Sequence, residues 1–236
     1  MKRDFLFSYY QTPRGEVLRQ QETDYLQRSI TVSCKQTILQ IGALGWETEV
    51  IDCTLYKYFI VLDTEGVSDP AVKKIRAEAS RLPLQCDSVD MIILPHFLEF
   101  DPCCLRTMRE VERVLKPEGT VVVVNFNPWS LRIRYEYLWE RQKHDVWSGH
   151  FISRTRVIDW LKLLNFEVIL FTEFNTNSVR SMHGKFIDNC YSLTAGAYAI
   201  KAIKRRYNII PLTPVCEAKP RLALVNSINP TTRVGS

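Results

Sequence analysis

The segment Thr120-Val121-Val122-Val123-Val124-Asn125-Phe126 decides the fold class of this chain of 236 residues. Four consecutive valines without polar alternation indicate a strand that is buried on both faces. Strands of this kind occupy the centre of parallel sheets, whose connections are crossovers that usually contain a helix. The segment therefore predicts a mainly parallel sheet with helices on both sides.

The residues before this strand fit such a sheet. Residues 102–115 carry apolar side chains at helical spacing, and Lys116-Pro117-Glu118-Gly119 predicts a turn because proline cannot continue the helix. Further upstream, short apolar runs predict buried strands at residues 36–41, 58–63, 74–79 and 87–95. The first of these runs ends at Gly42 and Gly45, which indicate a tight turn.

The residues after the valine strand continue the alternation of helices and strands. An aromatic-rich helical stretch at 130–142 precedes a helix at 154–164, for which Ser153 is the expected cap and Asn165 the expected end. Strands are predicted at 166–174 and 195–203. The pattern is that of an α/β protein, in which ligands bind at the carboxyl ends of the strands.

The two ends of the chain differ from this alternating region. An amphipathic helix is predicted at 15–30, so we assign residues 1–35 to an N-terminal helical extension and 36–207 to the main domain. Prolines at 211, 214, 220 and 230 stand among few large apolar residues, and residues 208–236 are expected to be an extended or disordered tail.

Composition indicates an ordinary globular protein, with 46% apolar residues and a formal net charge of +5. No apolar run is long enough for a signal peptide or a membrane span, so we expect a cytoplasmic protein without stable membrane insertion. Seven cysteines without a Cys-x-x-Cys pair favour reduced structural thiols over disulfides or a metal site. Basic clusters at 132–134 and 201–206 are interpreted as solvated faces, and nucleic acid is a disfavoured partner.

Several motifs together resemble the methyltransferase type 11 domain of the class I S-adenosylmethionine (SAM)-dependent methyltransferases. They are Leu82-Pro83-Leu84, Asp87-Ser88-Val89-Asp90 and the run from Arg109 to Gly119 with its Leu115-Lys116-Pro117-Glu118-Gly119 end. His96-x-Leu98-Glu99-Phe100 and Phe126-Asn127-Pro128-Trp129-Ser130-Leu131 are similar to a bacterial branch of small methyltransferase-domain proteins. The resemblance implies a Rossmann-like, seven-stranded, mostly parallel sheet with an antiparallel C-terminal hairpin, and SAM as the cofactor.

The same resemblance assigns the cofactor site. It implies that the Gly42–Gly45 turn lets the backbone approach SAM, that Asp63, with Glu65 as a possible substitute, binds the ribose hydroxyls, and that Glu78 and Ala79 flank the adenine. Pro95 and His96 follow the fourth strand and complete this set. Gln40 is also a cofactor-binding candidate, but it stands where the family pattern has an acid, and Leu44 replaces the middle glycine.

Three further residues are candidates for the acceptor side. Asn127 has a polar group and Trp129 a ring that suits a planar acceptor, and His150 lies in a segment expected to cover the site. His96 is the candidate general base, since a neutral imidazole is available near pH 7. Packing roles are the alternative for each of these residues. The next segment is aromatic, which suits an apolar or ring-bearing acceptor or, alternatively, a packed lid; its aromatic residues are Tyr135, Tyr137, Trp139 and Trp147.

These observations lead to one preferred function and two alternatives. The preferred function is an enzyme that transfers a methyl group from SAM to a small-molecule acceptor, with an RNA acceptor as a subordinate version. Gln40 and Leu44 support the first alternative, a catalytically inactive binding or regulatory protein with the same fold. The second alternative, a nicotinamide-dependent oxidoreductase, lacks the expected Gly-x-Gly-x-x-Gly motif.

Overall fold

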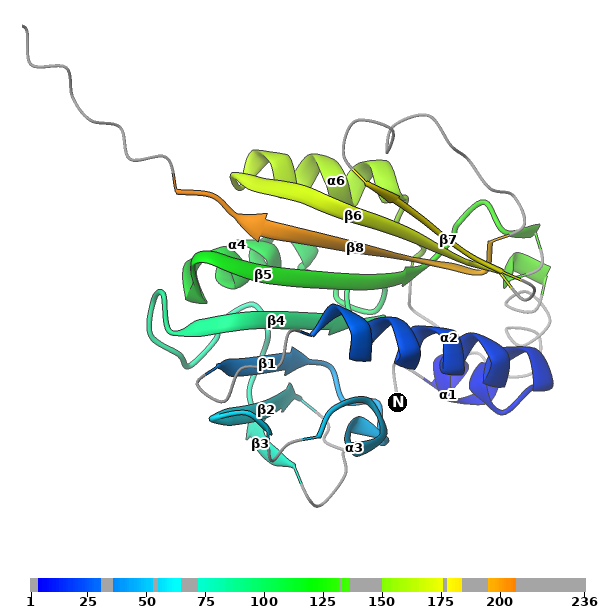
Figure 1. Ribbon diagram of the computed structural model, residues 1–236, viewed down its shortest axis with the longest axis horizontal. Coiled ribbons are helices and arrows are strands. Elements are labelled where there is room, and N and C mark those ends of the chain that lie inside the picture. Colours follow the sequence, from blue (N-terminus) through cyan, green and yellow to red (C-terminus); the bar gives the residue numbers. More distant parts are fainter. Residues whose placement is uncertain are drawn as a thin grey trace, which may run out of the picture. The chain divides into compact units, whose positions relative to one another are not determined.

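One mixed β-sheet organises the molecule. The computed structural model describes residues 4–30, 36–52, 55–64, 72–131, 133–135, 150–175, 178–183 and 195–206. In these residues, eight strands form a single sheet in the order β3-β2-β1-β4-β5-β8-β6-β7 (Figure 1). This confirms the predicted α/β class.

The first five strands are parallel and lie where the sequence predicts them, within a few residues. They are β1 (Thr37–Ile41), β2 (Tyr58–Asp63), β3 (Lys73–Arg76), β4 (Val89–Pro95) and β5 (Leu115–Phe126). The chain order reverses between β1 and β4, which lie side by side at the centre of this half. Ligands of doubly wound sheets bind outside the carboxyl ends of strands at such a reversal.

The turn predicted at residues 116–119 is an irregularity inside β5. Val89 pairs with Leu115 and Met91 pairs with Thr120, so four residues of β5 bulge opposite Asp90. A Cβ at Gly119 would lie 2.8 Å from the Lys116 carbonyl oxygen, which explains why glycine stands there. The proline and glycine therefore distort the strand without ending it.

The C-terminal strands are antiparallel to their neighbours. They are β6 (Phe166–Asn175), β7 (Ser178–His183) and β8 (Ala197–Lys204), with β8 between β5 and β6. The predicted hairpin is therefore present, but β7 adds an eighth strand at the sheet edge where a polar connection was expected. Its sequence, Ser-Val-Arg-Ser-Met-His, lacks the apolar run by which buried strands are recognised.

Helices cover both faces of the sheet (Figure 1). The helices are α1 (Asp4–Tyr10), α2 (Pro13–Ser29) and α3 (Glu47–Val50) on one face, and α4 (Cys104–Val114) and α6 (Arg154–Leu163) on the other. Val122 and Val124 pack in the core with α1 and α2, whereas Val121 and Val123 pack in the core with α4 and α6. The valine run is thus buried on both faces, as predicted.

The N-terminal helices meet at a tight corner. The Thr12 side chain accepts a hydrogen bond from the Gly15 amide at 3.0 Å, and Pro13 occupies the first helical position of α2. A Cβ at Gly15 would lie 1.9 Å from the Tyr9 carbonyl oxygen, so only glycine permits this approach of the two helices. Ser153 caps α6, and Asn165 has a positive φ of 60° after it, both as predicted.

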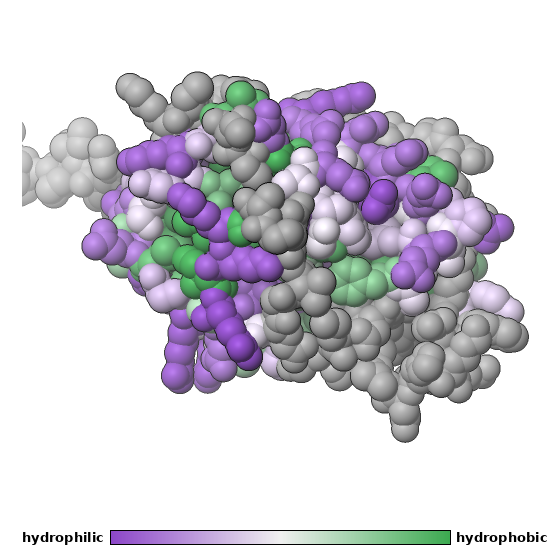
Figure 2. All heavy atoms as spheres, turned by 90° about the horizontal axis from the view of Figure 1, so that it is seen from below, coloured by the Kyte–Doolittle hydropathy of each residue, from purple (hydrophilic) through white to green (hydrophobic). Residues whose placement is uncertain are grey.

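Among the described residues, no helix has the length and hydropathy that crossing a membrane requires. On the face shown in Figure 2, hydrophilic side chains cover much of the described surface, and hydrophobic ones form small patches between them.

Candidate cofactor site at the carboxyl edge of the sheet

Hydrogen bonds join the turn after β1 to the end of β2. Gly42 and Gly45 have φ values of 99° and 91°, a region that favours glycine. The Gly42 amide donates to the Leu62 carbonyl at 2.8 Å, and the Ala43 amide donates to Asp63 Oδ2 at 2.8 Å. The sequence-predicted turn and the predicted ribose acid therefore lie side by side at this edge.

A buried carboxylate that sequence analysis missed organises the inside of the turn. Glu47 Oε1 accepts hydrogen bonds from the amides of Leu44 at 2.5 Å and Gly45 at 3.1 Å. Gln40 Nε2 donates to the same oxygen at 3.4 Å and to the Gly42 carbonyl at 2.9 Å. The negative charge expected at position 40 is therefore present seven residues later, and the amide of Gln40 supports it.

Replacing Glu47 with glutamine is expected to lower the free energy of unfolding by about 2 kcal/mol, since hydrogen bonds to a charged group are lost in a buried place. Urea denaturation measures this difference. Glu49→Gln is the matched control, because Glu49 is exposed on the same helix, and we expect a change below about 0.5 kcal/mol. Equal losses in the two variants would contradict the role of Glu47.

A second polar cluster links β4 to the N-terminal helices. His96 follows β4 with a φ of 48°, and its ring lies 3.0 Å from Glu99 Oε2 through Nδ1 and 3.1 Å from Glu22 Oε1 through Nε2. The Tyr10 hydroxyl donates to the other oxygen of Glu22, and the Phe126 amide donates to Glu99 Oε1 at 2.7 Å. All four polar side chains are buried, so the cluster connects α1, α2, β4 and β5.

The charge of this cluster bears on the role of His96. Burial opposes the charged form of His96, but the carboxylates of Glu22 and Glu99 outweigh it and raise the pKa of His96 to about 9. Burial and Glu22 together raise the pKa of the Tyr10 phenol. Both ring nitrogens lie within hydrogen-bonding distance of carboxylates, which favours the imidazolium and disfavours a neutral base at this position.

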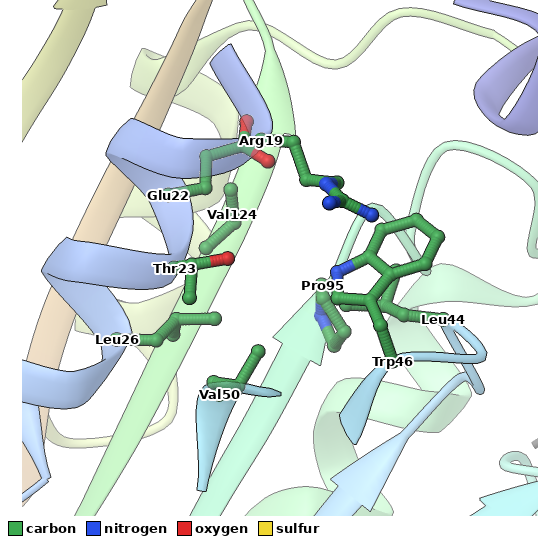
Figure 3. Close-up of a pocket in the computed structure, with 9 residues that line it drawn as sticks. All are labelled: Arg19, Glu22, Thr23, Leu26, Leu44, Trp46, Val50, Pro95 and Val124. Atoms are coloured by element: carbon green, nitrogen blue, oxygen red, sulfur yellow. The ribbon is translucent and has the colours of Figure 1, made fainter. Parts of the chain in front are cut away.

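The narrow cavity between α2 and the sheet shows how closely α2 covers this edge (Figure 3). It is lined by Arg19, Glu22, Thr23, Leu26, Leu44, Trp46, Val50, Pro95 and Val124. Its volume of about 10 Å³ has room for about one water molecule. The Arg19 guanidinium lies over the Trp46 ring at 5.1 Å, and Tyr10 contacts the same ring edge to face. The helix α2 is therefore packed directly against the turn.

The remaining cofactor candidates lie at the same edge but differ in exposure. Glu78 is exposed, and the Ser80 hydroxyl donates to it at 3.5 Å. Ala79 is buried in the core with α4, and Pro95 lines the narrow cavity. A Cβ built on Gly45 meets no atom within 4 Å, so the turn has open space on that side.

The acceptor-side candidates are Asn127, Trp129 and His150. Asn127 Nδ2 donates to the Ala195 carbonyl at 3.1 Å, and its Oδ1 accepts from the Trp129 amide at 3.1 Å, so this side chain holds a turn together. The ring of Trp129 is exposed. The His150 amide donates to the Glu99 carbonyl at 2.8 Å, and its Nε2 lies 3.7 Å from Cys104 Sγ. Asn127 and Trp129 thus follow β5, and His150 is hydrogen-bonded to the segment that follows β4.

Some predicted features lie outside the described residues. They are Glu65, Tyr137, Trp139, Trp147, residues 207–236 and the cysteines at 34, 53, 190 and 216. Cys86, Cys103 and Cys104 are free thiols, and burial raises the pKa of Cys104 to about 11. Among the described residues, no group of three or more His, Cys, Asp or Glu side chains is arranged so that it could hold a metal ion.

The strand order and the edge site define a class I methyltransferase fold, and the comparisons agree. Residues 36–123 match the family model of the methyltransferase domain. Over 194 residues, the chain is 25% identical to the uncharacterized protein YafS of Escherichia coli K12. This alignment covers 82% of this chain and 78% of YafS.

Solved structures show the same fold at low sequence identity. The YcgJ protein of Bacillus subtilis superposes with a TM-score of 0.59 and 15% identity, covering 80% of this chain and 100% of YcgJ. A possible histamine N-methyltransferase of Thermotoga maritima gives a TM-score of 0.57 and 17% identity, covering 85% of this chain and all of that one. These superpositions show that the chain has the class I methyltransferase fold.

The donor set at the edge fits the nucleoside part of SAM, and the domain match and the fold support SAM as the cofactor. Asp63 accepts the amides of Ala43 and Thr64, one on each oxygen. A carboxylate can accept several hydrogen bonds, which is the chemistry that two ribose hydroxyls require. The open side of Gly45 permits close approach to the backbone, whereas the cavity under α2 is too small for any part of the cofactor.

Proposed function

We propose that this protein is an enzyme that transfers a methyl group from SAM to a small-molecule acceptor. The observation that carries the proposal is the pairing of the glycine turn with Asp63 at the carboxyl ends of β1 and β2. This pairing lies inside the matched methyltransferase domain. The expectation of a bacterial cytoplasmic enzyme belongs to the same proposal, and the E. coli relative supports the bacterial source.

Each part of the edge has a distinct task in this proposal. Asp63 holds the ribose hydroxyls, Glu78 and Ala79 flank the adenine, and the backbone from Gly42 to Gly45 bounds the cofactor. SAM supplies a methyl group on a sulfonium, which needs little from the protein beyond alignment with the acceptor. His96 is then a positioning residue, because its ion pairs with Glu22 and Glu99 fix α2 and the end of β4.

The alternative of an inactive protein with the same fold rests on Gln40 and Leu44. Glu47 weakens that argument, because its buried carboxylate binds Gln40 and the Leu44 amide inside the turn. The substitution at position 40 therefore accompanies a relocated carboxylate. An enzyme with a cofactor site accounts for the presence of both the Asp63 carboxylate and the Glu47 carboxylate.

Calorimetric titration of the protein with SAM and with S-adenosylhomocysteine tests the proposal. We expect a dissociation constant in the micromolar range for both ligands, about −8 kcal/mol of binding free energy. NADH serves as the control nucleotide and should not bind at comparable concentrations. Failure of both sulfur ligands to bind at millimolar concentration would leave the inactive alternative as the better account.

A further inference from the structure

Three large apolar side chains stand exposed on the turn and helical residues that follow β5. Trp129 is 52% exposed, Leu131 is 72% exposed and Tyr135 is 66% exposed. Single exposed apolar residues are ordinary on protein surfaces, but neighbouring ones mark interaction sites more often. We call Trp129, Leu131 and Tyr135 the apolar tip.

The backbone under the apolar tip is held firmly. Asn127 binds the Ala195 carbonyl through its side chain and the Gly196 carbonyl through its amide, at 3.1 and 2.9 Å. The Ser130 carbonyl accepts the Arg134 amide at 3.1 Å, and Ser130 itself is buried. The turn from Asn127 to Ser130 is therefore anchored to the segment before β8.

One residue of this segment faces inward and sets the direction of the others. Ile133 is buried in the core that contains Leu18 of α2, close to Gly196. At 100° per residue, Leu131 and Tyr135 each lie about 200° from Ile133 and about 40° from each other. Both side chains therefore point outward together, away from the core.

Two arginines occur in the sequence of the tip. They are Arg132 and Arg134, of which Arg134 is exposed, and Glu136 follows Tyr135 directly. Tryptophan, tyrosine and leucine with neighbouring arginines are the composition that proteins use at the lipid–water interface. Arginine near such a surface is attracted to anionic headgroups.

We propose that the apolar tip docks the protein onto an anionic lipid bilayer as a peripheral, reversible contact. More than half of each side chain of the tip is exposed, and a fluid bilayer can bury exposed apolar side chains without a matching hollow. The tip follows β5 at the carboxyl edge of the sheet, so docking brings the candidate cofactor edge toward the lipid. This proposal goes beyond methyl transfer and does not depend on it.

Co-sedimentation with vesicles tests the docking in the absence of SAM. The native protein should sediment with vesicles of phosphatidylglycerol and phosphatidylcholine in equal parts, and several-fold less with phosphatidylcholine alone. Leu131→Ser should weaken the partitioning about tenfold, since a largely exposed leucine gains about 1.5 kcal/mol or more on burial. Leu163→Ser is the matched control, because Leu163 is 79% exposed on α6 and lies outside the tip.

A second measurement uses the native protein and avoids effects of the variants on folding. Brominated lipid in the vesicles should quench tryptophan fluorescence, and Trp129→Phe should remove most of that quenching. Absence of native binding to anionic vesicles, or equal losses for Leu131→Ser and Leu163→Ser, would overturn the proposal. A dimer in light scattering that Leu131→Ser dissociates, without vesicle binding, would also overturn it and assign the tip to a second copy of the chain.

Discussion

Asp63→Asn is expected to weaken SAM binding by about ten- to a hundredfold. A hydrogen bond to a charged group contributes about 1.5–3 kcal/mol, and asparagine offers one acceptor oxygen where aspartate offers two. The remaining oxygen can still accept the Ala43 amide, which keeps the turn attached to β2. The affinity for SAM should therefore fall much more than the free energy of unfolding. Calorimetric titration with SAM measures the loss of affinity.

Asp159→Asn is the control for this prediction because it removes the same charge from an exposed position on α6. Its affinity for SAM should equal that of the native protein within about twofold. If the two variants bind SAM equally well, the carboxylate of Asp63 does not contact the cofactor.

The second large effect concerns the buried cluster around His96. His96→Leu leaves the carboxylates of Glu22 and Glu99 buried without their cation, and removing one member of a buried ion pair costs about 3–5 kcal/mol. Urea denaturation near pH 7 should show this loss. His150→Leu removes an exposed histidine instead and should cost less than about 1 kcal/mol.

The pH dependence distinguishes an imidazolium from simple packing at position 96. The pKa of His96 is raised from 6.5 to about 9, so its stabilising effect is complete below pH 6.5 and is lost as the pH rises through 9. The native protein should lose about 3 kcal/mol of stability across that window. The Tyr10 phenol does not titrate there, because its pKa is raised further above its ordinary value. A native protein whose stability matches the pH profile of His96→Leu would contradict the charged state.

The sequence predicts the sheet well because its strands are continuous apolar runs. The four valines of β5 contact both cores, and the glycines after β1 have the positive φ angles that a tight turn requires. The position of Asp63 beside that turn follows from parallel strands whose carboxyl ends share one edge. These features depend on local pattern and simple topology.

The polar interior of the site could not be predicted in the same way. Glu47 reads as an ordinary residue at a helix start, and its role appears only when the turn directs the Leu44 and Gly45 amides toward it. His96 reads as a free base, because nothing local shows that Glu22, far away in the sequence, will lie beside it. Burial and pairing over such separations are set by tertiary structure.

The measurement that tests the central claim most directly is a crystal structure of the protein with S-adenosylhomocysteine. We expect the ribose hydroxyls within hydrogen-bonding distance of the Asp63 carboxylate and the ligand against the Gly42–Gly45 turn, with Glu78 and Ala79 beside the adenine. A ligand bound elsewhere in the molecule, without contact to the Asp63 carboxylate, would contradict the account.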